Sequence, residues 1–282
     1  MMLNNKVGLG TVQFGLNYGI SNFQGKTNSE EVVKILELAY QNGVQILDTA
    51  QSYGDSEVVI GKIHNNRFKI VTKFQPNNGD PRSAHNFVKK SLDKLQIDHL
   101  YGLLFHTAES ALNNPRILIE LKKLQEQGKI SKLGYSVYDI NELISLINKY
   151  GNPDILQVPY NHLDRRFEYI IETLHAEGVE IHSRSTFLQG IYFCDSTLLP
   201  GFFDPIKPYL NKLKSNFVDN QNIANALLDF SLSKRFIDHV IIGVNSEHQL
   251  QENLKIESIR NSLPEIPENI PEQILNPSKW PK

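Results

Sequence analysis

The feature that most constrains this chain is an alternation of short apolar runs with longer segments of helical periodicity, repeated about eight times. Each run is rich in aliphatic or β-branched residues and is bounded by turn residues or a helical stretch. The expected strands are Val7–Thr11, Gln45–Thr49, Lys69–Lys73, Leu100–Phe105, Ser131–Ser136, Ile155–Val158, Val179–Ser183 and Val240–Val244. Strand–helix alternation implies parallel strands with right-handed crossovers. About eight such units in 282 residues predict an α/β protein, a single-domain (β/α)8 TIM barrel, with an open doubly wound sheet as the alternative.

The first expected helix shows why the segments between the strands are predicted to be helical. Asn28 or Ser29 can cap it, and two glutamates follow in the first turn, where the helix dipole favours carboxylates. Apolar residues then recur at three- and four-residue spacing between Val32 and Ala39. Further helices are expected over Ser83–Leu95, Arg116–Gln127, Asn141–Lys149, Phe167–Glu177 and Ile223–Leu232.

No shift in composition marks a second domain, so residues 1–263 are expected to form one barrel. The segment Asp195–Pro208 is rich in Pro, Gly and Phe and predicts a long loop. Residues 264–282 hold five of the 13 prolines and cannot form one continuous helix. They also carry large apolar residues that a disordered tail usually lacks. We expect this C-terminal tail to pack on the barrel, with Trp280 either bordering the substrate or only adding stability.

The composition argues against several classes of protein. Lys plus Arg number 29 and Asp plus Glu 31, so the net charge is −2 and gives no electrostatic reason for a nucleic-acid partner. The single cysteine, Cys194, excludes an intramolecular disulfide and a multi-thiolate metal site, and no metal is expected. No apolar run approaches 18 residues and no signal peptide is evident, so the expectation is a cytoplasmic protein with no membrane partner.

Polar residues follow three successive expected strands, at the end of a barrel where active sites lie. Asp48, Lys73 and His106 close these strands, and Tyr53 follows in a glycine-containing loop. Each residue alone has an ordinary structural explanation, but their joint occurrence favours a proton-donating site. A lysine ammonium is expected to lower the pKa of a tyrosine, an aspartate to hold the lysine, and a histidine to orient a carbonyl oxygen.

Three segments carry a resemblance to a known family. Leu47-Asp48-Thr49-Ala50-Gln51-Ser52-Tyr53-Gly54, Val71-Thr72-Lys73 and Leu104-Phe105-His106 resemble the catalytic segments of the aldo-keto reductase superfamily, in a bacterial member. The likeness runs from Gly8 to about Leu254. It implies a catalytic tetrad of Asp48, Tyr53, Lys73 and His106 at the mouth of the barrel.

The resemblance also implies a nicotinamide cofactor site. The opening Gly8-Leu9-Gly10-Thr11 is similar to the family's first strand but is no dinucleotide fingerprint, because Gln13 stands where that motif needs Gly. Ser136 and Gln157 match the residues that contact the nicotinamide carboxamide, and His182 is placed where the family often has a stacking Tyr. The implied cofactor-binding set is Gly10, Thr11, Asp48, Ser136, Gln157, His182, Ser183, Ser185, Gly190, Gly243, Ser246, Gln249, Glu252 and Asn253.

The family's usual cofactor is NADPH, with NADH as the alternative here. Asn245 occupies the position at which many members carry an Arg for the 2′-phosphate. Ser246 and backbone N–H groups at a helix start can still bind an anion.

The expected activity is NAD(P)H-dependent carbonyl reduction of a small-molecule aldehyde or ketone, by a monomer or weak homo-oligomer. A similarity to bacterial relatives found beside surface-glycan pathways makes a keto-sugar or nucleotide-sugar intermediate a candidate substrate. The rival class is a nucleotide-bound regulatory or interaction subunit on the same barrel, with little turnover. The residues expected to bind substrate are Phe14, Tyr18, Phe74, Tyr160 and Arg184, with His162 also considered.

Overall fold

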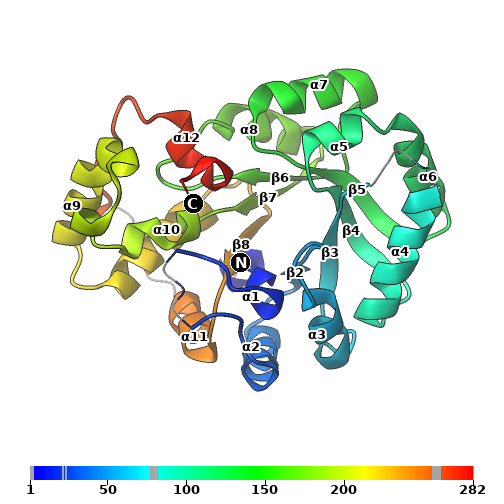
Figure 1. Ribbon diagram of the computed structural model, residues 1–282, viewed down its shortest axis with the longest axis horizontal. Helices are drawn as coiled ribbons and strands as arrows, with labels where there is room; N and C mark the ends of the chain where they lie inside the picture. The colour runs from blue at the N-terminus through cyan, green and yellow to red at the C-terminus, as the bar shows by residue number, and fades with distance from the viewer. Residues whose placement is uncertain are drawn as a thin grey trace.

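The chain folds into a closed barrel of parallel strands ringed by helices (Figure 1). The computed structural model describes residues 3–20, 22, 24–76, 80, 82–255 and 262–281. Its strands are β1 Val7–Gly10, β2 Ile46–Asp48, β3 Lys69–Phe74, β4 Leu100–Phe105, β5 Ile130–Ser136, β6 Ile155–Pro159, β7 Glu180–Arg184 and β8 His239–Gly243. Each strand pairs with the next, and β8 closes on β1, so the barrel is confirmed and the open sheet is excluded.

Helices follow the strands in the manner that alternation predicts. The α-helices are α1 Val12–Gly15, α2 Ser29–Gln41, α3 Ser56–Ile63, α4 Arg82–Leu95, α5 Ala108–Leu112, α6 Pro115–Glu126, α7 Ile140–Tyr150, α8 Glu168–Ala176, α9 Lys207–Asn216, α10 Asn220–Leu232, α11 Glu247–Leu254 and α12 Glu272–Leu275. The 3-10 helices are η1 Leu3–Lys6, η2 Leu188–Phe193, η3 Ser196–Leu198, η4 Gly201–Ile206 and η6 Pro277–Lys279. The segment expected as one long loop therefore contains two 3-10 turns and the start of α9.

The cap of α2 illustrates the local reasons for these elements. The Asn28 side chain accepts a hydrogen bond from the Glu31 N–H at 2.9 Å, which satisfies one of the free donors of the first turn. Val32, Ile35 and Leu36 are fully buried, as the apolar spacing requires.

The side chains inside the barrel form an apolar layer below a polar layer at the mouth. The apolar layer consists of Ile46, Val71, Leu104, Ile155 and Ile241. Because strand side chains alternate between the two faces, the inward residue two positions later on a strand lies at the mouth. Gly8 allows this layer to close, since a Cβ there would lie 2.5 Å from the Ile241 Cδ1 atom.

The C-terminal tail packs beside α10 (Figure 1). It joins a second hydrophobic cluster, whose buried residues are Leu163, Leu188, Ile191, Tyr192, Phe203, Ile206, Tyr209, Leu210, Leu213, Ile223, Leu227, Ile274 and Leu275. Ile274 and Leu275 are buried in that cluster, and the ring of Trp280 lies edge-on to Phe203, 5.0 Å between centroids. The Trp280 indole donates to the Ile274 carbonyl at 2.9 Å. These contacts are structural, and Trp280 is not among the residues that line the cavity at the barrel mouth.

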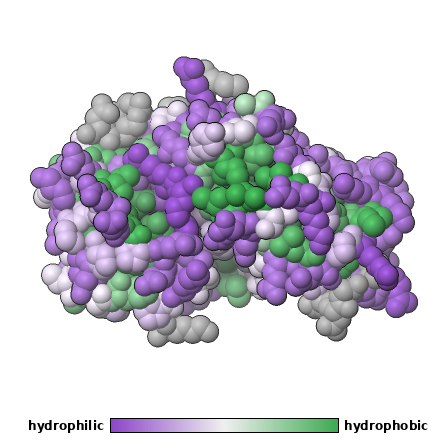
Figure 2. Space-filling view, turned by 90° about the horizontal axis from the view of Figure 1, so that it is seen from above, coloured by the Kyte–Doolittle hydropathy of each residue, from purple (hydrophilic) through white to green (hydrophobic). Residues whose placement is uncertain are grey.

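The surface seen from above is largely hydrophilic, with hydrophobic groups gathered in separate areas (Figure 2). Apolar atoms make up much of any folded protein's surface, so such areas are ordinary. Among the described residues, no helix has the length and apolar character needed to span a membrane.

Candidate active site

Asp48, Lys73 and Tyr53 form one hydrogen-bonded chain at the mouth of the barrel. The Lys73 ammonium donates to Asp48 Oδ1 at 2.5 Å, to the Thr49 carbonyl at 3.0 Å and to the Tyr53 hydroxyl at 3.5 Å. The side chains of Lys73 and Asp48 are 1% and 6% exposed. Gln157 donates to the other oxygen of Asp48 at 2.7 Å. The strands β2, β3 and β6 thus bring together a buried ion pair whose ammonium reaches the tyrosine.

The electrostatics keep Tyr53 protonated. Burial, followed by the Asp48 carboxylate, holds the pKa of Tyr53 above its ordinary value, and Arg184 opposes this shift. This direction is opposite to the lowering expected from Lys73, whose charge is committed to Asp48. Burial also lowers the pKa of Lys73, against the attraction of Asp48. The phenol therefore retains a proton that it can donate.

His106 lies beside Tyr53 as a neutral imidazole. The two rings are edge-to-face with centroids 6.0 Å apart, and Ser52 Oγ lies 3.3 Å from His106 Nδ1. Burial, aided by Lys73, lowers the pKa of His106 to about 4. At neutral pH the ring therefore has one N–H donor and one lone pair, which suits it to orient a polar group.

A cavity of about 630 Å³ opens above these four residues, within the usual size of a ligand site. Asp48, Tyr53, Lys73 and His106 all line it. It also brings together nine further residues of the predicted cofactor set: Gly10, Thr11, Ser136, Gln157, Ser185, Gly190, Gly243, Gln249 and Asn253.

Four predicted cofactor residues lie outside this lining. His182 is fully buried one inward position below Arg184 on β7 and is bonded to Glu180, so it is no stacking partner for a ligand in the cavity. Ser183 alternates to the opposite face of β7 and is also fully buried. Ser246 lines a separate cavity, and Glu252 pairs with Lys255.

Arg184 is the cavity residue that β7 contributes in place of His182. Strand β7 runs one residue further than expected, so Arg184 shares the inward face with His182. Its guanidinium carbon lies 3.6 Å from the centroid of the Tyr138 ring, and it donates to the Val137 carbonyl at 3.0 Å. The guanidinium is thereby held over an aromatic face.

Of the five predicted substrate residues, Tyr18 and Arg184 line the cavity. Phe14 is fully buried in the main core, and Phe74 packs on Phe87 and Phe105. Tyr160 stacks on Phe230 and donates to Glu168 at 2.9 Å. None of these three aromatic residues lines the cavity.

His162, the other mouth candidate, is also directed elsewhere. It is 5% exposed, its Nδ1 lies 2.8 Å from the Tyr209 hydroxyl, and burial lowers its pKa to about 4.

Several lining residues were not predicted. Tyr138 lies just past β5, and Asn220 and Gln221 begin α10. A search of the positions two or three past each strand could have found Tyr138. The α10 residues follow no strand end, so the sequence contains no comparable signal for them.

The turn from Ser185 to Gly190 is conformationally strained where it borders the cavity. Ser185, Leu188 and Gln189 all have positive φ, at 63°, 44° and 53°, which costs non-glycine residues energy. Gln189 links this turn to the loop that follows α1, because its side-chain amide donates to the Tyr18 hydroxyl at 3.0 Å. Such strain is typical of ligand clamps.

The lining fits a dinucleotide. Ser136 and Gln157, 3.4 Å apart, offer the hydroxyl and amide groups that a carboxamide needs. Gln13 Oε1 and Asn245 Oδ1 are buried acceptors without a partner among the described residues, and both residues line the same cavity. These groups leave hydrogen-bonding capacity for a polar ligand along its length.

Comparisons with known proteins identify the family. The model of the aldo/keto reductase family matches residues 6–266. L-galactose dehydrogenase of Arabidopsis thaliana is 25% identical over 91% of this chain and 89% of its own length. The NADH-specific methylglyoxal reductase of Escherichia coli (strain K12) is 25% identical over 66% of this chain and 65% of its own. Two other curated relatives are matched over only 46% and 49% of their length.

The fold has matching solved structures. The holo form of an aldo-keto reductase from Bacillus halodurans superposes with a TM-score of 0.70 at 21% identity, covering 89% of this chain and 86% of that one. This likeness shows the fold, and the family match over nearly the whole chain establishes the assignment. The chain belongs to the aldo/keto reductase family and is a nicotinamide-dependent oxidoreductase.

Proposed function

We propose that the chain is a carbonyl reductase that converts a polar aldehyde or ketone to an alcohol. Tyr53 donates the proton to the carbonyl oxygen, and Lys73 and Asp48 position its hydroxyl. His106 orients the oxygen from the other side. The bound nicotinamide cofactor supplies the hydride, and Ser136 and Gln157 hold its carboxamide.

The observation that carries this proposal is the 3.5 Å contact between the Lys73 ammonium and the Tyr53 hydroxyl at the floor of the cavity. A phenol whose pKa is raised by burial is a weak acid by itself. An adjacent ammonium stabilises the phenolate that forms when the proton leaves.

Turnover distinguishes a reductase from a nucleotide-bound regulatory subunit. The purified full chain is mixed with reduced cofactor and an activated aldehyde, and loss of the reduced cofactor's absorbance is followed beside a control without protein. Catalysed loss that disappears in Lys73→Met supports the proposal. Tight cofactor binding without any turnover on a broad carbonyl panel contradicts it.

The substrate is proposed to be polar and anionic, with carboxylated or phosphorylated keto-sugars as the first candidates. Arg184 contributes a cation to the cavity lining, and Tyr18 and Tyr138 add hydroxyl groups to the same lining. Planar guanidinium groups bind carboxylate and phosphate in two-point contacts. Comparing kcat/KM for matched neutral and anionic keto-sugars, in the wild type and Arg184→Met, tests this. Equal loss for both substrates would contradict a charge-based role.

We also propose that NADH is preferred to NADPH. The Glu247 N–H at the start of α11 donates to Glu31 Oε1 at 2.7 Å, and the Gln249 N–H donates to Ser246 Oγ at 3.2 Å. Two backbone donors of the first turn of α11 are thus already occupied, one of them by a carboxylate.

The neighbouring cavity supports the same preference. It measures about 330 Å³, shares Asn245 with the main cavity, and is also lined by Glu31, Ser246 and Lys26. Lys26 is paired with Asp55 at 2.6 Å. A carboxylate accepts a ribose hydroxyl but repels a phosphate, which is how nucleotide sites commonly distinguish the two cofactors.

Dissociation constants for NADH and NADPH, measured by fluorescence without substrate, test the preference. Glu31→Gln and Asn245→Arg are each expected to shift the ratio toward NADPH by about 10-fold, the effect of one charged hydrogen bond. Glu30→Gln, one residue earlier and exposed, is the matched control. A wild-type ratio that favours NADPH, unchanged in Glu31→Gln, would contradict the assignment.

A further inference from the structure

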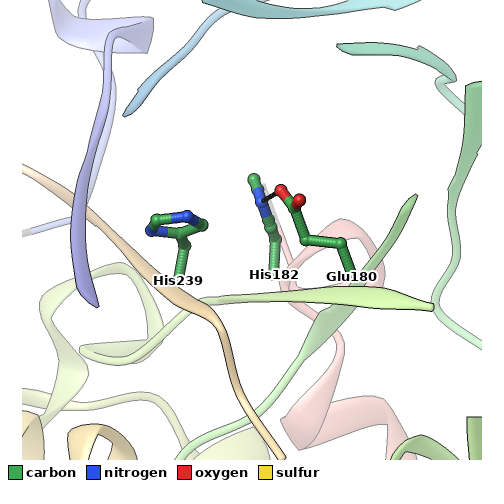
Figure 3. Close-up of side chains that lie close together, drawn as sticks. All are labelled: Glu180, His182 and His239. Carbon is green, nitrogen blue, oxygen red and sulfur yellow. Dashed lines mark hydrogen bonds and ion pairs between the residues drawn. The ribbon is translucent and has the colours of Figure 1, made fainter. Parts of the chain in front are cut away.

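Inside the barrel, below the catalytic residues, two histidines and a glutamate converge (Figure 3). Glu180 and His182 project from β7 and His239 from β8, with His182 between the other two (Figure 3). One nitrogen of each histidine and one carboxylate oxygen of Glu180 lie within 4.8 Å of one another. The imidazole rings are 4.9 Å apart between centroids and nearly perpendicular.

The two histidines have unused lone pairs. His182 is fully buried and its Nε2 lies 2.7 Å from Glu180 Oε1, so that nitrogen carries the proton and Nδ1 is a free acceptor. Neither His182 Nδ1 nor His239 Nδ1 has a partner among the described residues. Buried acceptors without partners are costly, so a group that satisfies both would be stabilising.

We propose that His182 and His239 bind a divalent transition-metal ion through their free Nδ1 atoms, with Zn²⁺ as the natural candidate and Glu180 orienting the His182 ring through its Nε2–H. No metal was expected from the sequence, and the reductase chemistry uses none of these residues. Zinc takes imidazole nitrogen at about 2.0–2.1 Å, so ligand atoms on one ion can be up to about 4.2 Å apart. Two imidazole nitrogens can therefore share one ion, and water molecules can complete its four-coordinate shell.

The surroundings select the class of ion. Glu180 Oε2 is held by Tyr101 at 2.7 Å and by the Lys132 ammonium, and Oε1 accepts from His182 Nε2, so the carboxylate orients this ring instead of binding the ion. Because Lys132 already balances the carboxylate, the site offers no excess negative charge to Mg²⁺ or Ca²⁺, which need several oxygen ligands. Two imidazoles instead suit Zn²⁺, Ni²⁺ or Cu²⁺.

The site lies where the barrel is weakly joined. Strands β7 and β8 share only two register pairs, one of which is His182 with His239, whereas β4 and β5 share five. An ion ligated from both strands links them at this point. His239 is the first residue of β8 and only half-buried, so the ion can enter from the end of the barrel opposite the catalytic mouth. The expected role is structural stabilisation of the barrel.

Metal binding to the untagged full chain tests the proposal. After chelator treatment and its removal, Zn²⁺ is titrated against a chromophoric chelator, and one equivalent is expected with a Kd of about 1 µM or tighter. His182→Asn and His239→Gln should each weaken binding at least ~10-fold, whereas the exposed His85→Asn should not. Tyr53→Phe should bind zinc normally, because the site is separate from the mouth.

Two further measurements keep the test decisive if His182→Asn folds poorly. Zn²⁺ should raise the wild-type Tm, and this rise should be lost in the half-buried His239→Gln variant. Co²⁺ should produce the visible absorption of a four-coordinate ion in the wild type alone. Stoichiometric binding weaker than ~100 µM, or binding untouched by both histidine changes, would overturn the proposal. A crystal structure with only water bridging the two Nδ1 atoms after zinc soaking would do so as well.

Discussion

Replacing Asp48 by Asn is expected to lower the free energy of unfolding by about 3–5 kcal/mol at pH 7, because it leaves a buried ammonium without its counter-charge. The Lys73 side chain is 1% exposed, so water cannot replace the lost carboxylate. The amide introduced by this change can still accept from one neighbour, but it has no charge to offset that of Lys73. The same change removes the group that positions Lys73 beside Tyr53, so turnover should fall together with stability.

The stability penalty should shrink as the pH rises. Burial lowers the pKa of Lys73 while Asp48 raises it, so losing Asp48 lowers this pKa further in the folded variant. Above that lowered pKa, the folded variant sheds a proton that the unfolded chain keeps, up to its own pKa of about 10.4. The unfolded state then binds more protons, and the variant regains stability relative to the wild type by up to ~1.4 kcal/mol per pH unit.

Urea unfolding at pH 7 and pH 9, followed by far-UV circular dichroism, measures both effects. Asp93→Asn on the exposed face of α4 is the control and should change stability by less than ~0.5 kcal/mol. The double variant Asp48→Asn/Lys73→Met should recover much of the loss without recovering activity, since no charge remains buried. A penalty below ~1 kcal/mol, or one that is the same at both pH values, would refute the reasoning.

Three further outcomes are expected. Tyr53→Phe should lower turnover at least ~10²-fold with cofactor Kd nearly unchanged, measured by steady-state rates beside a binding titration; full activity would end its assignment as the acid. Burial lowers the pKa of His106 and His162 to about 4, so the unfolded chain protonates first. Stability should therefore fall below pH 6.5 by up to ~1.4 kcal/mol per unit for each, and His162→Gln should show a shallower acid limb in denaturant titrations. Truncation after Leu263 removes Ile274 and its neighbours from the second cluster, so it should lower Tm and leave KM at low temperature unchanged. A raised KM without a lower Tm would instead give the tail a substrate role.

The sequence was sufficient to predict the barrel and the four residues that meet at its mouth. The strand–helix period sets the class of fold, and a parallel barrel brings all strand ends to one rim. Asp48 and Lys73 each end up two positions past an inward apolar residue, so their direction follows from simple alternation. The contact between them could thus be expected before any coordinates.

The cofactor and substrate residues were less predictable, because they depend on the exact ends and facing of each strand. A one-residue extension of β7 puts Arg184 in the cavity and leaves His182 in the interior below it. Phe74 directly follows the inward Lys73 and so faces the helices instead of the mouth. Residue type near a strand end does not reveal which face it takes.

Tertiary structure alone decided the groupings that join distant segments. Glu31 of α2 reaches the first turn of α11, and Glu180 and His182 meet His239 from the next strand. Asn220 and Gln221 reach the cavity from α10, after a long excursion through α9. Periodicity is a local property of the chain and therefore specifies the elements. Contacts between elements depend on register, tilt and loop path, which only the packing of the whole barrel determines.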